Sequence, residues 1–282
     1  MRSLLFVPAN VERFVRRAPS VGADAVILDL EDSVPEERKA EARRALGWAA
    51  RHVRSNSGSK VMVRVNSVGT VHFREDVAAA LEAGCDALVL PKCDGADSVG
   101  ALRRLVEELG GEVKVVALIE SAKGVVDAAG IAGSWGSIAG LAFGAFDFAL
   151  SMGIASPSRE LLRIAKSLVA IAAKAHGLLA IDTPYARLSD IEGLREECSE
   201  AKSLGYDGKL AIHPDQVPVI NEAFSPTKEE VEWARRVVEV MEAARSEGRS
   251  SAVLEGSMVD EVHYRLATMV LRRASAQGTT LK

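Results

Sequence analysis

The chain has 282 residues, of which 48% are hydrophobic and 26% are charged, and its formal net charge at pH 7 is −4. This composition is typical of a globular protein, and the mild negative charge argues against a dedicated nucleic-acid-binding protein. No stretch approaches the roughly 18 uncharged apolar residues of a membrane span, and three sparse cysteines are typical of a reducing compartment. We therefore expect a cytoplasmic protein without membrane or nucleic-acid partners.

Short apolar runs alternate with amphipathic segments along the first three quarters of the chain. Runs rich in leucine and β-branched residues predict strands, and segments with apolar residues every three or four positions predict helices. Strands are expected at 3–7, 25–30, 61–66, 87–91, 113–119, 138–143, 178–182 and 208–212, and helices at 36–54, 74–83, 98–109, 160–176 and 190–203. Such nearly continuous hydrophobic strands are typical of a parallel sheet that is buried on both faces.

Eight strands with intervening helices predict a closed (β/α)8 barrel, the TIM-barrel fold, over residues 1–225. The alternative is an open, doubly wound sheet. That fold favours a glycine-rich phosphate-binding turn after its first strand, and the sequence there is Val7-Pro8-Ala9-Asn10 instead. The barrel is therefore the preferred prediction.

The regular alternation stops after the eighth predicted strand, and residues 226–282 predict a helical extension. Helices are expected at 228–247 and 257–275, with no strand between them. The first of these helices carries an apolar stripe of Trp233, Val237, Val238 and Met241. This stripe could pack on the barrel of its own chain or on a neighbouring subunit, and the sequence favours neither alternative.

Polar residues follow the carboxyl end of nearly every predicted strand. In chain order they are Asp29, Glu31, Asp32, Arg64, Lys92, Glu120, Asp147, Asp182 and His213. In a parallel barrel these strand ends meet at one rim, where the active sites of this fold lie. The sequence therefore predicts a catalytic rim.

Three acids within residues 29–32 exceed what a helix cap needs. Asp32 could cap the following helix, but Asp29 and Glu31 would then have no structural role. Neighbouring carboxylates that are buried together are costly unless cations balance them. Arg64 could be such a cation, either as a structural partner of the acids or as a substrate-binding group, and a metal ion could be another.

Glu120 and Asp147 are hard oxygen donors of the kind that suits Mg²⁺ or Mn²⁺. Zinc is less suitable, because the five histidines and three cysteines show no zinc-ligand spacing. Lys92 and Lys209 lie close to strand ends, so catalysis through a Schiff-base lysine is an alternative to catalysis through a metal ion. His213 is interpreted as a hydrogen-bonded histidine that faces the core.

Several short motifs in a fixed order resemble the beta subunit of citrate lyase and its relatives in the HpcH/HpaI aldolase group. They are residues 2–8 (RSLLFVP), 24–35 (DAVILDLEDSVP), 63–66 (VRVN), 88–92 (LVLPK), 119–122 (IESA), 143–144 (FG), 209–216 (KLAIHPDQ) and 258–260 (MVD). The resemblance covers essentially the whole chain. It implies a TIM barrel with a Mg²⁺-dependent carbon–carbon lyase activity on 3-hydroxyacyl thioesters, such as citryl, malyl or citramalyl thioesters of coenzyme A or an acyl carrier protein.

The resemblance also implies roles for residues of the rim. Glu120 and Asp147 would be the metal ligands, with Mg²⁺ expected and Mn²⁺ as the alternative. Arg64 would bind the carboxylate or carbonyl group of the 2-oxo acid, and Glu31 with Asp32 would hold metal-bound waters. The family forms trimers or hexamers, so we expect a homo-oligomer.

Further implied contacts involve the substrate and the neighbouring subunit. Gly144, Ala145 and Phe146 are expected to bind the substrate, and Asn10 and Arg13 to bind coenzyme A. In thioester-cleaving members, the acid that corresponds to Asp260 reaches into the site of a neighbouring subunit. The helical extension is therefore expected to pack on that subunit.

Three positions depart from the family pattern. Ala9 stands where the family usually has glycine, and Ser257 stands where a lysine is common, which puts the coenzyme A contacts in doubt. Phe146 stands where an acid commonly precedes the metal-binding aspartate, which removes a charge beside the metal and bears on substrate choice.

The expected reaction is cleavage, or the reverse condensation, of the thioester into an acyl thioester and oxaloacetate, glyoxylate or pyruvate. One alternative is an enzyme that hydrolyses malyl-coenzyme A, or that condenses and hydrolyses like a malate synthase. Another is a catalytically silent barrel that serves as a subunit of an assembly. Glu120, Asp147 and Arg64 together favour an active enzyme.

Overall fold

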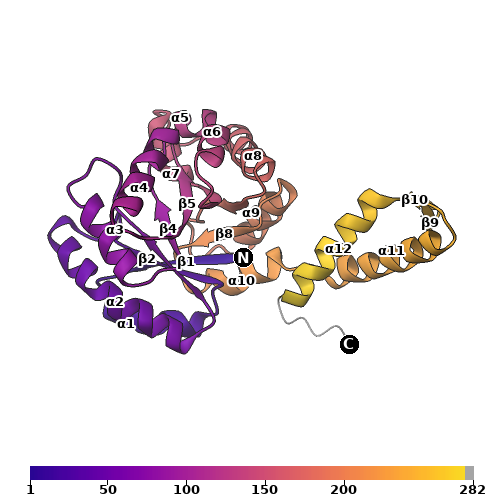
Figure 1. Ribbon diagram of the computed structural model, residues 1–282, viewed down its shortest axis with the longest axis horizontal. Helices are drawn as coiled ribbons and strands as arrows, with labels where there is room; N and C mark the ends of the chain where they lie inside the picture. The colour runs from indigo at the N-terminus through magenta and orange to yellow at the C-terminus, as the bar shows by residue number, and fades with distance from the viewer. Residues whose placement is uncertain (277–282) are drawn as a thin grey trace. The chain divides into compact units, whose positions relative to one another are not determined.

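The computed structural model of the protein describes residues 1–276 and separates two compact units, Met1–Phe224 and Ser225–Lys282. In the first unit, eight parallel strands close into a barrel surrounded by helices, which confirms the predicted TIM barrel (Figure 1). Each strand pairs with the next along the chain, and β1 pairs with β8 to close the ring. The strands are β1 (Ser3–Pro8), β2 (Ala25–Asp29), β3 (Lys60–Arg64), β4 (Ala87–Leu90), β5 (Lys114–Ile119), β6 (Ile138–Phe143), β7 (Leu179–Asp182) and β8 (Gly208–Ala211).

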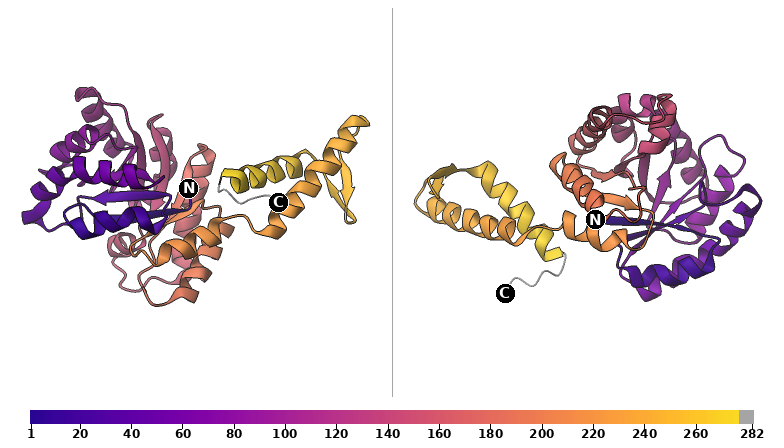
Figure 2. Two further views of the ribbon diagram at one scale, coloured as in Figure 1. Left: turned by 90° about the horizontal axis from the view of Figure 1, so that it is seen from below. Right: turned by 180° about the vertical axis from the view of Figure 1, so that it is seen from behind.

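The helices of the first unit lie outside the ring of strands, as Figure 2 shows from two further sides. They are α1 (Glu12–Arg17), η1 (Ala18–Val21), η2 (Glu36–Arg38), α2 (Lys39–Asn56), α3 (Phe73–Glu82), α4 (Ala96–Glu108), α5 (Ala122–Val126), α6 (Ala128–Gly133), α7 (Ala145–Ser151), α8 (Arg159–Ala175), α9 (Ile191–Ser203) and α10 (Gln216–Phe224). Across residues 1–276, no helix combines the length and the apolar character that crossing a membrane requires.

Alternation along the strands divides the apolar side chains between two layers, because successive side chains point to opposite faces. One layer fills the barrel and the other packs between strands and helices. The inner layer consists of Leu4, Ala25, Ile27, Met62, Ala87, Val89, Val116, Leu118, Ala142, Ile181 and Leu210. Asp29, Arg64 and Glu120 each follow an inner residue by two positions, so their side chains point toward the inside of the barrel at its carboxyl rim.

Asp182 has the opposite orientation, because it directly follows the inward-facing Ile181. Its carboxylate is fully buried, with Lys209 Nζ 2.6 Å from Oδ2 and Lys166 Nζ 2.9 Å from Oδ1. Burial opposes the charge of Asp182, but the two ammonium groups lower the pKa of its carboxyl below the ordinary value. Asp182 is therefore structural, and the prediction that it joins the rim site is wrong. The Schiff-base alternative also fails for Lys209, because its fully buried ammonium lies 2.6 Å from Asp182 Oδ2 and 2.9 Å from Glu197 Oε2.

The second unit consists of two helices with a short β-hairpin at one end, as Figure 1 shows for α11 (Lys228–Ser246) and α12 (Glu261–Ala276). Strands β9 (Ala252–Leu254) and β10 (Ser257–Val259) pair antiparallel between the helices. Glu255 and Gly256 connect them with φ of 52° and 80°, the left-handed backbone typical of two-residue hairpin turns. The expectation of a helix from 257 and of no intervening strand is therefore wrong.

The apolar stripe predicted on the first C-terminal helix packs within the second unit. Val237 and Met241 of α11 share one buried cluster with Val259 of β10 and Ala267 of α12. Thr227 begins α11 with a capping box, in which its hydroxyl accepts from Glu230 N–H and the Glu230 carboxylate accepts from Thr227 N–H. The partner of the stripe is thus α12 and the hairpin, which the sequence did not predict.

Candidate functional site

A cavity of about 580 Å³ lies at the carboxyl rim of the barrel. Its charged lining consists of Arg17, Asp29, Asp32, Arg64, Glu120 and Asp147. Much of its apolar wall comes from Phe6, Leu118, Phe146, Pro184, Leu210 and Ile212. The cavity thus brings together acids and a cation that the strand-end pattern placed at the rim.

Arg64 is held in one orientation by the acids that follow β2. Its Nε and Nη2 donate to Oδ1 and Oδ2 of Asp29, each at 2.7 Å, and its Nη1 lies 3.1 Å from Glu31 Oε2 and 3.2 Å from Asp32 Oδ2. Burial opposes the charge of Arg64, but these acids raise the pKa of the guanidinium. A bidentate pair fixes the plane of the guanidinium group. The structural role that the sequence left open for Arg64 is therefore present.

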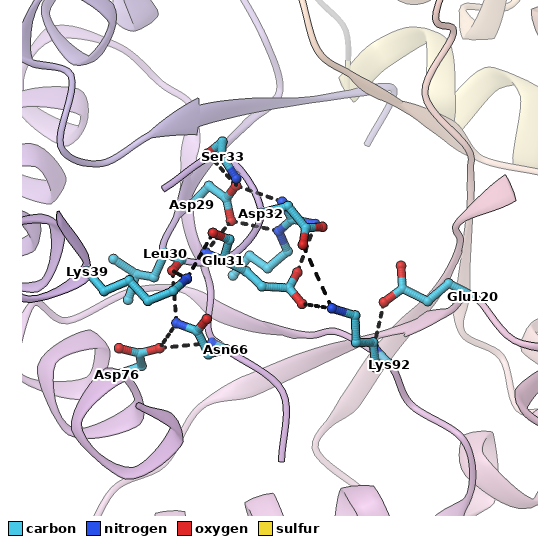
Figure 3. A network of polar contacts seen from close by, with 11 residues as sticks. Asp29, Leu30, Glu31, Asp32, Ser33, Lys39, Asn66, Asp76, Lys92 and Glu120 are labelled. Atoms are coloured by element: carbon cyan, nitrogen blue, oxygen red, sulfur yellow. Dashed lines mark hydrogen bonds and ion pairs between the residues drawn. The ribbon is translucent and has the colours of Figure 1, made fainter. Parts of the chain in front are cut away.

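Two buried polar side chains, Lys39 and Asn66, hold the backbone of the loop after β2 (Figure 3). Lys39 Nζ donates to the carbonyl oxygens of Leu30 and Glu31, each at 3.0 Å, and Asn66 Nδ2 donates to the Leu30 oxygen at 2.9 Å. Asp32 pairs with Arg64 and does not cap the next helix, so the cap interpretation is wrong. No sequence signal indicates that Lys39 points inward, because charged helix residues usually face solvent.

Glu120 is buried and fixed from two sides. Its Oε1 accepts a hydrogen bond from the backbone N–H of Lys92 at 2.6 Å. On the other side, a Cβ at Gly144 would lie 2.7 Å from Glu120 Cβ and 2.8 Å from Oε2. Glycine at position 144 is therefore a requirement of close approach, and it lets the carboxylate lie against the start of α7.

Gly144→Ala is expected to displace the Glu120 carboxylate and to weaken Mg²⁺ binding by roughly tenfold, which corresponds to about 1.4 kcal/mol. Isothermal titration calorimetry measures this affinity. Gly136→Ala is the matched control, because a Cβ there meets nothing within 4 Å. Unchanged Mg²⁺ affinity in a folded Gly144→Ala protein would show that the close approach does not position the carboxylate.

The electrostatics of Glu120 fit a cation. Burial raises the pKa of Glu120 to about 8. The hydrogen bond from the Lys92 N–H lowers this pKa, whereas the negative charges of Glu31 and Asp147 raise it further. A divalent cation would offset the repulsion, and Mg²⁺ typically takes one or two carboxylates. Within residues 1–276, no group of three or more His, Cys, Asp or Glu side chains is arranged to hold a metal. Water and substrate oxygens would therefore complete the coordination.

The metal-free protein is expected to lose stability as the pH rises through the range that separates the two pKa values of Glu120. The ordinary value is 4.5 and the folded value is about 8. Between them the folded state holds a proton that the unfolded state has lost, so the free energy of unfolding falls by at most about 1.4 kcal/mol per pH unit. Urea unfolding in EDTA measures this slope, and Glu120→Gln should reduce it. An equal slope in the variant would contradict the assignment.

The residues expected to bind substrate lie at the start of α7. Gly144 and Phe146 line the rim cavity, and Phe146 is 56% exposed. Ala145 instead lines a neighbouring cavity of about 950 Å³, which shares Phe146 and Pro184 with the first. The Ala145 N–H donates to Thr183 Oγ1 at 3.0 Å. Phe146 therefore forms a wall between two cavities.

The residues expected to bind coenzyme A lie around the start of α1. Asn10 is buried, and its Oδ1 accepts no hydrogen bond from any residue in the described range 1–276. Arg13 lies over the ring of Phe14 at 4.8 Å and does not line the rim cavity. Phe14 and Arg17 do line it, and the sequence did not single them out.

His213 lines the rim cavity, and its side chain is 40% exposed. The interpretation of a core-facing histidine is therefore wrong. The buried polar residue of this segment is Gln216, whose Oε1 accepts from the N–H of Ile212 and whose Nε2 donates to the Tyr185 oxygen. Gln216 shapes the turn that leaves His213 facing the cavity.

Asp260 lies in the second unit, between β10 and α12. Its Oδ1 lies 2.7 Å from His263 Nδ1 and accepts from the Val262 N–H at 3.0 Å. The hydrogen bond from His263 lowers the pKa of the Asp260 carboxyl. Its expected place in the site of a neighbouring subunit stays a prediction.

Comparison with known proteins gives consistent results in sequence and structure. The model of the HpcH/HpaI aldolase/citrate lyase family matches residues 2–214. A (3S)-malyl-CoA thioesterase of Cereibacter sphaeroides is 36% identical over 276 residues, which cover 98% of this chain and 95% of that protein. The citrate lyase subunit beta of Escherichia coli is 35% identical over 285 residues, with coverages of 98% and 94%. The crystal structure of CitE from Mycobacterium tuberculosis in complex with magnesium, acetoacetate and coenzyme A has a TM-score of 0.80 and 36% identity, and the match covers 97% of this chain and 98% of that chain.

Proposed function

Because the chain belongs to the HpcH/HpaI aldolase/citrate lyase family, we propose that it is a Mg²⁺-dependent lyase acting on a 3-hydroxyacyl thioester. The products would be an acyl thioester and a 2-oxo acid, with citryl, malyl and citramalyl thioesters as the candidate substrates. The observation that carries the proposal is the rim cavity, in which Glu120 and Asp147 lie with the anchored guanidinium of Arg64.

Glu120 and Asp147 are proposed to hold the metal ion. When bound, Mg²⁺ would supply the positive charge that stabilises the alkoxide developing on the substrate hydroxyl as the carbon–carbon bond breaks. The related CitE structure contains magnesium, which supports this choice of ion. Mn²⁺, which favours similar oxygen ligands, is the alternative.

Arg64 is proposed to orient the 2-oxo acid part of the substrate. Asp29 engages Nε and Nη2, so the guanidinium plane is fixed before substrate arrives. Nη1 contacts Glu31 and the half-exposed Asp32, and a substrate oxygen could take the place of the Asp32 carboxylate at Nη1. A preorganised cation of this kind orients the substrate and stabilises charge in the transition state. Glu31 and Asp32 are proposed to hold water molecules of the metal site.

Asp260 is proposed to act in the site of a neighbouring copy. It would protonate the thioester enolate during cleavage, or deprotonate the methyl group during condensation. Support comes from α12, where Val262, Leu266 and Met269 are 62%, 49% and 50% exposed at helical spacing. A stripe of this kind fits the packing of the extension on another subunit of a trimer or hexamer.

Hydrolysis is the second candidate activity, because the (3S)-malyl-CoA thioesterase is similar over nearly the full length of both chains. A thioesterase would release free coenzyme A and a hydroxy acid, without breaking a carbon–carbon bond. A silent barrel is less well supported, since Glu120, Asp147 and Arg64 all line one cavity.

A cleavage screen over citryl-, malyl- and citramalyl-coenzyme A, with added Mg²⁺, tests the proposal. Mass spectrometry identifies the products. An acyl-coenzyme A and a 2-oxo acid in equal amounts would support the lyase, and free coenzyme A with a hydroxy acid would support the thioesterase instead. Failure to turn over any of these substrates would contradict both.

A further inference from the structure

Lys92, which directly follows Pro91 at the end of β4, has a left-handed backbone with φ of 50°. Among residues 1–276, Glu255 in the β-hairpin turn is the only other non-glycine residue with positive φ. Residues with a Cβ adopt this conformation rarely, because the Cβ approaches the backbone too closely. A lysine in this conformation indicates that its contacts hold it there.

Those contacts involve both the backbone and the side chain. The backbone N–H donates to Glu120 Oε1 at 2.6 Å. The side chain extends the other way, and its Nζ lies 2.9 Å from Glu31 Oε1 and 3.8 Å from Asp32 Oδ1. Figure 3 shows Lys92 between the acids of the β2 loop and Glu120. One residue therefore contacts the proposed metal ligand and the acids beside it.

The carboxylate of Glu31 is held by the two cations beside the proposed metal site. Its side chain is buried, and each of its oxygens pairs with a cation, Oε1 with Lys92 Nζ at 2.9 Å and Oε2 with Arg64 Nη1 at 3.1 Å. Lys92 contacts Glu31 through its Nζ and Glu120 through its N–H, so a single residue lies between the two carboxylates. Within the described part of the chain, no group of three or more His, Cys, Asp or Glu side chains is arranged to hold a metal ion.

We propose that Lys92 is a positioning residue that keeps Glu31 from becoming a third carboxylate ligand of the metal at Glu120 and Asp147. A third carboxylate would neutralise more of the charge of the ion and occupy a coordination position that a 2-oxo acid needs. The ammonium of Lys92 holds one oxygen of Glu31 away, while its N–H fixes Glu120. This inference rests on the proposed function, because it takes Glu120 and Asp147 as the metal ligands.

Lys92→Gly separates the two contacts of Lys92. Glycine accepts the left-handed backbone and keeps the N–H to Glu120, but it lacks the ammonium. Calorimetry measures the Kd of Mg²⁺ and then, at saturating Mg²⁺, the Kd of pyruvate. We expect Mg²⁺ to bind roughly tenfold more tightly to the variant, since a nearby positive charge is removed and Glu31 can join the ion. Pyruvate should bind roughly tenfold more weakly, because it loses a coordination position.

Two further variants test the cause. Lys92→Arg keeps the positive charge and should leave both Kd values within about threefold of the wild type. Adding Glu31→Gln to Lys92→Gly removes the third carboxylate and should abolish the part of the gain in Mg²⁺ affinity that Glu31 supplies. Weaker binding of both ligands by Lys92→Gly would indicate a general structural role and overturn the inference, and so would two unchanged Kd values. Absence of Mg²⁺ binding to the wild-type protein would overturn the proposed function itself.

Discussion

Glu120→Gln is expected to lower the rate of metal-dependent thioester cleavage by about 10³-fold or more. The variant keeps the shape of the side chain but loses the charge that would hold Mg²⁺ beside Asp147. Because Glu120 is buried and burial raises its pKa, the neutral amide should not destabilise the fold. Steady-state kinetics and the Kd of Mg²⁺ should therefore change together while the melting temperature does not fall.

Glu112→Gln is the matched control for this variant. Glu112 is exposed just before β5, with no assigned part in the cavity, so its loss should leave both kinetics and metal affinity unchanged. Near-normal turnover in Glu120→Gln would remove Glu120 from the metal site and leave the lyase proposal without its main residue.

Arg64→Met is expected to reduce both stability and activity. Without the guanidinium, Asp29 keeps a fully buried carboxylate whose main charge partner is gone. Breaking a buried pair in this way typically costs about 3–5 kcal/mol of unfolding free energy. Turnover should also fall sharply, because the proposed contact to the 2-oxo acid is lost. Urea unfolding measures the loss of stability, and the Kd of pyruvate measures the loss of the contact to the 2-oxo acid.

The double variant Asp29→Asn with Arg64→Met distinguishes the two roles of Arg64. Removing the stranded charge should restore part of the stability, whereas binding of the 2-oxo acid should stay weak. If the double variant recovered pyruvate affinity together with stability, Arg64 would be a structural partner of the acids and no more than that.

The barrel could be predicted from the sequence because its strands are continuous apolar runs separated by amphipathic helices of ordinary length. The C-terminal hairpin could not, since its strands have three residues each and the apolar residues of 257–259 run directly into the pattern of α12. Its one local signal is the pair Glu255-Gly256, whose left-handed backbone makes the turn. A glutamate at such a position is not a typical turn residue, which explains why the signal was missed.

The site could be predicted in outline because functional side chains of this fold follow the strand ends. Which of them face the barrel depends on the alternation of side chains along each strand. Glu120 follows the inward Leu118 by two residues and points inward, whereas Asp182 follows the inward Ile181 by one residue and points outward. Contacts that depend on tertiary geometry had no sequence signal. Examples are the buried ammonium of Lys39 under the β2 loop and the left-handed backbone of Lys92.

The most direct test of the metal site is a crystal structure of the protein grown with Mn²⁺ and pyruvate, with anomalous scattering recorded to locate the ion. The proposed function predicts one strong anomalous peak at roughly 2.1–2.2 Å from one carboxylate oxygen of Glu120 and one of Asp147. Glu31 should remain on Lys92 and Arg64, outside the coordination sphere. A peak bound elsewhere, or none at these two carboxylates at saturating Mn²⁺, would contradict the central claim that the rim carboxylates hold a catalytic metal.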